Sequence, residues 1–189
     1  MRLPVLLSLL ITLFSTPAIA GSVDIGLNDD SFQIGFEQAL SNDNYGNSFG
    51  NARFLYNGDE ETKMGSIGFD FIGRPGNLPG LSVGAGSKLY LGKTDHNAEF
   101  INLGIGLRTD YTLPQLQGLG VSAGLYYAPD VFSGRDSNKL MDFQVRLTYA
   151  IIPKVKLFLG YQNIQLDVDG SHGTWTIDDG IRAGFVGSF

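Results

Sequence analysis

The sequence of 189 residues has no cysteine, two histidines and one tryptophan. After residue 20 it also lacks any apolar run near the roughly 20 residues that a transmembrane helix needs. Without cysteine there are no disulfides, on which small secreted domains often rely, so stability must come from packing or from surrounding lipid. Basic residues are few as well, because 13 Lys and Arg against 19 Asp and Glu give a net charge of −6. This balance argues against a nucleic-acid partner, which would need a basic surface.

Residues 1–20, MRLPVLLSLLITLFSTPAIA, have the pattern of a secretory signal peptide. Arg2 supplies a positive charge, residues 3–14 form an apolar run too short to span a bilayer, and Ala18-Ile19-Ala20 is a small-x-small cleavage site. Cleavage is therefore expected before Gly21. Because no Pro-rich, Ser-rich or charged linker divides the remainder, residues 21–189 are predicted to form one exported domain.

The rest of the chain is rich in glycine, with 26 residues, and in short segments where apolar residues alternate with small or polar ones. Helical i, i+3, i+4 spacing is absent, and turn-forming residues end each segment, which is typical of β-strands. The segments pair into successive hairpins. The predicted strands span residues 22–28, 32–40, 50–57, 62–73, 81–92, 99–111, 120–128, 141–151, 155–166 and 175–189.

The composition of the two strand faces favours a membrane barrel over a soluble sandwich. In residues 81–91, one face carries Leu, Val and Ala, and the other carries Ser, Gly, Lys and Tyr. A sandwich also alternates apolar and polar residues, but a narrow barrel interior explains the glycines on the polar face, because small residues must alternate there with polar ones. The predicted fold is all-β, an antiparallel transmembrane β-barrel of eight to ten strands. Ten is preferred, and eight applies if the first hairpin lies outside the main sheet.

The same alternation predicts which side chains contact lipid. Apolar residues in the middle of the strands should face the acyl chains, and aromatic residues near strand ends should form the two interfacial girdles. The expected lipid-facing residues are Leu103, Ile105, Leu107, Val145, Leu147 and Leu159. The expected girdle residues are Tyr56, Tyr111, Tyr127, Tyr149 and Trp175.

The last predicted strand ends on an aromatic residue after alternating apolar positions, whereas soluble domains usually fray into polar residues at a terminus. An even number of strands would put both termini on the periplasmic side, with residues 129–138 and 167–173 as outer loops. The terminal pattern resembles the assembly signal of bacterial outer-membrane barrels. It implies location in the outer membrane, contact with its lipid and recognition by the barrel-assembly machinery. The signal residues are Ile181, Ala183, Phe185 and Phe189.

Four stretches also carry a family resemblance: AIAGSVDIGLNDDSFQIGF, GNARFLYN, SVGAGSKLYLG and GIRAGFVGSF. With them, residues 1–189 resemble the YfaZ family of small outer-membrane proteins. The resemblance implies the location and the fold. It implies no site residues.

Strand alternation places charged residues of both signs, in equal number, on the inward face. An unpaired charge in a narrow lumen is costly, so mutual ion pairing is expected. A barrel of this size has an interior that side chains nearly fill. We therefore predict a neutral, plugged lumen with Arg108, Arg146 and Arg182 at its centre and carboxylates within reach. The predicted network comprises Arg53, Lys88, Arg108, Arg146, Lys156 and Arg182 with Asp24, Glu37, Asp70, Asp110, Asp142 and Asp178.

Several functions are compatible with this barrel. We favour a structural or surface-interaction role without catalytic chemistry, and expect a monomer by default. The alternative is a narrow channel or a small-ligand binder, although a selective pore would need one sign of charge to dominate a ring. An outer-membrane hydrolase and a soluble periplasmic β protein are the remaining possibilities.

The hydrolase hypothesis depends on His96 or His172 in predicted outer loops, with Asp95, Asp167 or Asp169 as orienting partner. Ser171 adjoins His172 in sequence, which is not the through-space arrangement of a nucleophile and its base, and Asp and His are common in ordinary turns. Sites for a metal, a phosphate or a cofactor are not expected. The sequence has no Cys or His cluster, no calcium loop with a closing Glu and no glycine-rich start of a helix.

Overall fold

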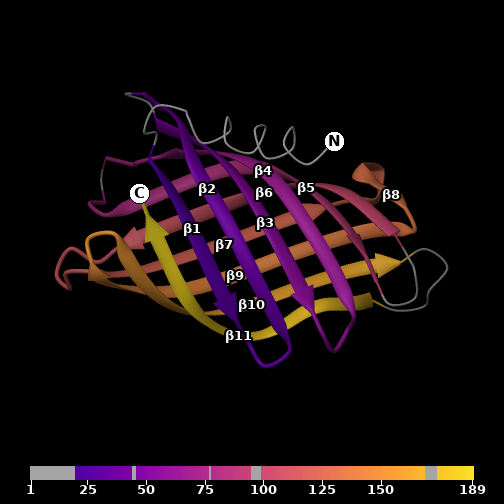
Figure 1. Ribbon diagram of the computed structural model, residues 1–189. Helices are drawn as coiled ribbons and strands as arrows, with labels where there is room; N and C mark the ends of the chain where they lie inside the picture. The colour runs from indigo at the N-terminus through magenta and orange to yellow at the C-terminus, as the bar shows by residue number, and fades with distance from the viewer. Residues whose placement is uncertain (1–19, 44–45, 77, 95–98, 169–173) are drawn as a thin grey trace, which may run out of the picture.

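The structure, a computed structural model, describes residues 20–43, 46–76, 78–94, 99–168 and 174–189. Antiparallel strands close into a barrel in which each strand pairs with its neighbours around the ring and the first strand pairs with the last (Figure 1). The strands are β1 (Gly21–Leu27), β2 (Ser31–Asp43), β3 (Gly46–Asn57), β4 (Thr62–Gly73), β5 (Leu81–Lys93), β6 (Glu99–Thr112), β7 (Leu119–Ala128), β8 (Ser133–Arg135), β9 (Ser137–Ile152), β10 (Val155–Val168) and β11 (Thr174–Ser188).

The ring contains ten strands, because the short β8 continues the path of β7. After the 3-10 turn η1 (Asp130–Phe132), β8 pairs with β6 beyond the point where β7 stops. The first hairpin, β1 and β2, belongs to the ring and joins it to β11. The all-β barrel and the preferred ten strands are thus confirmed. The described residues include no helix that is both long and apolar enough to cross a membrane.

The barrel has two distinct ends. At one end, which we call the terminal end, the backbones of Gly21 and Phe189 exchange hydrogen bonds of 3.3 and 3.0 Å, and the ring of Phe189 stacks on Phe36. Turns after β4, β6 and β9 lie at the same end. Gly80 in the first of these turns has φ +88°, and a Cβ there would lie 2.2 Å from the carbonyl oxygen of Thr112, so glycine is required. We call the opposite end, with the turns after β1 and β3, the loop end.

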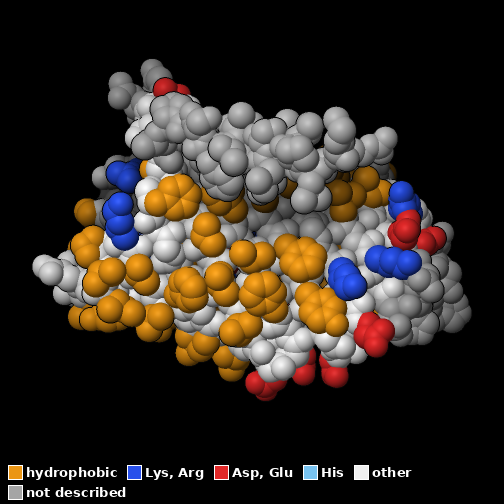
Figure 2. Space-filling view, viewed as in Figure 1, with side chains coloured by type: hydrophobic (Ala, Val, Ile, Leu, Met, Phe, Trp, Pro, Cys, Tyr) orange, Lys and Arg blue, Asp and Glu red, His pale blue; other side chains and the backbone are white. Residues whose placement is uncertain are grey.

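The outward face of the strands is an apolar band. Five of the six residues expected to face lipid are exposed, with Ile105 and Leu107 at 58% and 66%, and the sixth, Val145, is half-buried. Figure 2 shows apolar side chains over the visible wall and Lys and Arg side chains at both of its ends. An exposed apolar surface of this extent is what a membrane-embedded wall requires.

Of the five residues expected in the girdles, the four tyrosines are exposed on the outward face, but Trp175 differs. It is partly buried and packs against the apolar cluster inside the barrel. The reason is a β-bulge: the register between β10 and β11 shifts so that Ile164 faces Asp178 and Gln165 faces Thr176. The extra residue, Ile177, reverses the alternation, so Trp175 turns inward. Alternation alone does not reveal such a shift.

Candidate functional site in the barrel lumen

The glycines on the inward face make room for charged side chains of neighbouring strands. Gly35 is the register partner of Asp24, and Gly86 is the partner of Asp70. A Cβ on Gly35 would lie 2.1 Å from Oδ2 of Asp24, and one on Gly86 would lie 1.9 Å from Oδ1 of Asp70. Gly160 is likewise paired with Arg146. Glycine on the polar face is therefore the steric counterpart of the charges.

The first group of buried charges joins β3, β5 and β9 across the lumen. Nη2 of Arg53 donates to Oδ2 of Asp142 at 2.6 Å, and the same oxygen accepts the hydroxyl hydrogen of Tyr90 at 2.9 Å. Asp142 and Tyr90 are fully buried. Because β3 and β9 lie on opposite walls of the ring, this ion pair spans the interior.

The second group surrounds Asp70 of β4. Its Oδ1 accepts a hydrogen bond from the hydroxyl of Tyr126 at 2.5 Å, and its Oδ2 accepts one from the amide of Asn51 at 2.8 Å. The Lys88 ammonium lies 3.8 Å from the centre of the Tyr126 ring. A cation over the face of an aromatic ring is stabilised by the ring quadrupole. Lys88 is thus held without a direct ion pair among the described residues.

The third group is built on Arg182 and Asp178 of β11. Nη2 of Arg182 donates to Oδ2 of Asp178 at 2.8 Å and to the hydroxyl of Ser31 at 2.6 Å. The Ser31 hydroxyl in turn donates to Oδ1 of Asp178, and the amide of Gln162 donates to its Oδ2 at 2.9 Å. The arginine and aspartate are 2% and 1% exposed. Asp178 lies on the same inward face of β11 as Arg182, and the bulge at Ile177 changes the face only of the residues before Asp178, such as Trp175.

The charges nearer the terminal end are more accessible. Arg108 pairs with Glu37 and, at 3.0 Å, with Asp110, and these three side chains are 26%, 27% and 35% exposed. Arg146 lies 3.6 Å from Asp24 and stacks over Phe158. The centre therefore differs from the prediction: Arg182 belongs to it, but Arg53 and Asp142 replace Arg108 and Arg146.

Lys156 is a further difference from the predicted network. Lys156 lies two residues before the buried Phe158 and so has the same inward direction in the strand. It is nevertheless exposed, because it lies near the terminal end of β10. It forms no ion pair with any residue that the structure describes. Inward alternation gives the face of a side chain but not its depth in the barrel, which explains the difference.

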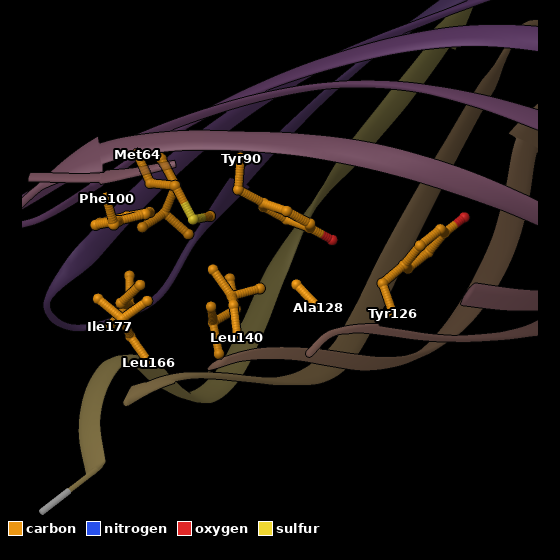
Figure 3. Close-up of a cluster of buried hydrophobic side chains, with 10 residues drawn as sticks. Met64, Tyr90, Phe100, Tyr126, Ala128, Leu140, Leu166 and Ile177 are labelled. Carbon is orange, nitrogen blue, oxygen red and sulfur yellow. The ribbon is translucent and has the colours of Figure 1, made fainter. Parts of the chain in front are cut away.

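The loop half of the lumen contains a cluster of buried apolar side chains that the sequence pattern does not predict. Figure 3 shows its side chains projecting into the interior from several strands, with Tyr90 and Tyr126 carrying their hydroxyls at one side. These two tyrosines connect the cluster to the charged groups, because they donate to Asp142 and Asp70. The members are Leu55, Met64, Tyr90, Phe100, Tyr126, Ala128, Leu140, Ile164, Leu166 and Ile177, all at 2% exposure or less.

The residues of the hydrolase hypothesis lie mostly outside the described part of the chain. His96, His172, Ser171, Asp95 and Asp169 belong to residues 95–98 and 169–173. Predicted signal-peptide residues 1–19 also lie outside it. The described residues contain no group of three or more His, Cys, Asp or Glu side chains that could hold a metal ion.

Comparison with known proteins gives a family and a set of weak structural likenesses. The family profile described as YfaZ precursor matches residues 1–189, and no curated protein matches the chain. The KdgM porin is 10% identical with a TM-score of 0.48, over 90% of this chain and 99% of the porin. The outer membrane channel DcaP of Acinetobacter baumannii is 13% identical with a TM-score of 0.43, over 93% of this chain and 66% of the channel. The translocator domain of the autotransporter NalP from Neisseria meningitidis is 13% identical with a TM-score of 0.37, over 100% of this chain and 94% of the translocator domain.

Proposed function

Because the chain belongs to the YfaZ precursor family and folds into a barrel that holds buried apolar and charged side chains inside, we propose a structural or surface-interaction protein of the outer membrane whose lumen is closed to ions. One observation carries the proposal: an apolar cluster in the loop half lies next to a charged network in which Arg53 pairs with Asp142 across the interior. Ions would have to pass both layers. An apolar constriction opposes them by excluding water.

The proposed location follows from the outer surface and the ends of the barrel. The apolar band suits a lipid bilayer. The terminal end faces the periplasm, so the loops after β1 and β3 face outward and are available to partners. Ile181, Ala183, Phe185 and Phe189 lie on the outward face of β11 or at its end. There they would be accessible to the barrel-assembly machinery before the seam with β1 closes.

Recording across a planar lipid bilayer tests the closed lumen. Purified wild-type barrel should insert without stable unitary conductance steps. A heat-modifiable gel shift of the same sample shows that the inserted protein is folded. Stable unitary conductance from the wild-type barrel would contradict the proposal.

A narrow channel is the second candidate, because the charges toward the terminal end are partly open to solvent. Arg108, Glu37 and Asp110 are about a quarter to a third exposed, as expected of a water-filled vestibule. The channel would be favoured over the closed barrel if the wild-type protein conducts ions and the Arg108→Gln variant conducts them with a different ion selectivity.

We also propose that the protein has no hydrolytic activity. In the sequence, both histidines stand in short polar segments that are predicted to be loops, without a partner fixed by spacing. A lipase, deacylase or protease activity that is lost in His96→Ala or His172→Ala, but kept in Asp59→Ala, would move the hydrolase hypothesis to first place.

A further inference from the structure

The outward wall built from β2 to β5 contains an apolar groove of about 410 Å³. Small residues, Ala52 and Gly65, leave space between the larger Phe54, Ile67 and Leu91. A Cβ on Gly65 would meet no atom closer than 4.0 Å. The three larger side chains are 44% to 58% exposed, so the groove opens to the outside of the barrel and suits an apolar chain lying along the wall.

Two lysines continue this wall toward the loop end. Lys63 of β4 and Lys93 of β5 are register partners, and both are exposed. They lie on the same face as Gly65 and Leu91, and each is two residues closer to the loop end than the groove residue of its strand. At about 3.4 Å per residue, their backbones are about 7 Å from the groove. An amphiphile could thus reach the lysines with its headgroup and the groove with its chain.

The described carboxylates near these lysines form no ion pair with them. Glu99 is the register partner of Lys93, but it forms its ion pair with Arg135. The ammonium of Lys63 lies 5.9 Å from the ring centre of Tyr56. Neither lysine has an ion pair with a carboxylate of the described residues. Two positive charges at the rim of the apolar band are therefore available to an anion.

We infer that this wall binds a phosphorylated, multiply acylated glycolipid of the outer leaflet, with an acyl chain in the groove and a phosphate between Lys63 and Lys93. The inference rests on the proposed orientation, in which the loop end faces outward. A phosphate monoester carries about −1.5 to −2 charge at neutral pH and accepts several hydrogen bonds, which matches two ammonium groups. The diester of a common phospholipid has only one charge.

The chain offers matched controls for both halves of the site. Lys139 is also exposed near the loop end, but it belongs to β9 on another wall and has Asp167 as its register partner. Ala85 is exposed on β5, the strand of Leu91 and Lys93, and does not line the groove. Lys139→Gln and Ala85→Leu therefore repeat the test substitutions away from the site.

Native mass spectrometry of the full chain in detergent, titrated with hexa-acylated bisphosphorylated lipid A, tests the inference. The double variant Lys63→Gln, Lys93→Gln should weaken binding by at least about tenfold, because charge-assisted hydrogen bonds are lost. Gly65→Leu should fill the groove and also weaken binding. Lys139→Gln and Ala85→Leu should bind as the wild type does.

Three results would overturn the inference: unchanged binding by both the double-lysine variant and Gly65→Leu, equal affinity for phosphatidylglycerol, or displacement of lipid A by millimolar inorganic phosphate. The heat-modifiable gel shift is measured for every variant, and the groove and lysine variants test the site independently. Conductance of the wild-type barrel would contradict the closed lumen without changing this outcome, so the two proposals fail separately.

Discussion

At the scale of single residues, the fit between inward glycines and charged side chains gives the first prediction. Gly86→Ala places a Cβ against Oδ1 of Asp70 and 2.4 Å from the carbonyl oxygen of Phe69. The backbone oxygen cannot move freely, so the barrel should lose about 1 to 3 kcal/mol of unfolding free energy. Gly65→Ala, on the outward face of β4, has open space and should leave stability unchanged. Urea titration in lipid vesicles measures both variants, and equal stability would contradict the steric account.

The buried ion pair across the lumen gives a second prediction at the same scale. Asp142→Asn keeps the shape of the side chain but removes the charge that faces Arg53. A buried guanidinium without its counterion is strongly destabilising, so we expect a loss of about 3 to 5 kcal/mol. Asp110→Asn is the control, because its partner Arg108 keeps Glu37 and the site is partly solvated. If the two variants unfold at the same urea concentration, Asp142 does not hold the centre of the network.

At the scale of the strand, the outward face predicts the cost of a charge in lipid. Ile105 lies near the middle of β6 and is exposed. Ile105→Arg should destabilise the barrel by about 2 to 4 kcal/mol if residue 105 lies at the bilayer midplane. The control is Val131→Arg in η1, which is 82% exposed and lies beyond the strands. Unfolding titrations in vesicles compare them, and a stable Ile105→Arg barrel would exclude this facing.

The strand is also the scale at which sequence reasoning succeeds and then stops. Alternation is a local property, so it predicts ten strands, their antiparallel order and the outward leucines of β6. It does not show how deep a residue lies, which is why it wrongly predicts that the exposed Lys156 belongs to the network. Nor does it detect the bulge at Ile177, because one extra residue changes no composition. At Leu55 and Tyr56 both faces of the strand are apolar, so alternation does not show which residue faces inward. It therefore does not predict that this part of the lumen is apolar.

At the scale of the whole molecule, the two layers of the lumen meet at Tyr90 and Tyr126. Both side chains are fully buried, belong to the apolar cluster and donate their hydroxyls to carboxylates of the charged network. The apolar cluster and the charged network should therefore both stay closed to ions as long as the rings of Tyr90 and Tyr126 fill the space between them. Removing one ring leaves the other and the surrounding apolar side chains in place, whereas removing both joins the polar half to the loop half.

The double variant Tyr90→Ser, Tyr126→Ser should consequently admit water and show brief unitary openings in a planar bilayer, while each single variant stays silent. We expect the openings because the two rings no longer fill the lumen, since serine keeps a hydroxyl group but lacks the ring. Tyr127→Ser is the matched control, because Tyr127 follows Tyr126 in β7 and is 45% exposed on the outward face. Each sample needs a heat-modifiable gel shift before recording. Openings in the Tyr127→Ser control, or a silent double variant that is folded, would show that the ion barrier lies elsewhere than at the junction of the two layers.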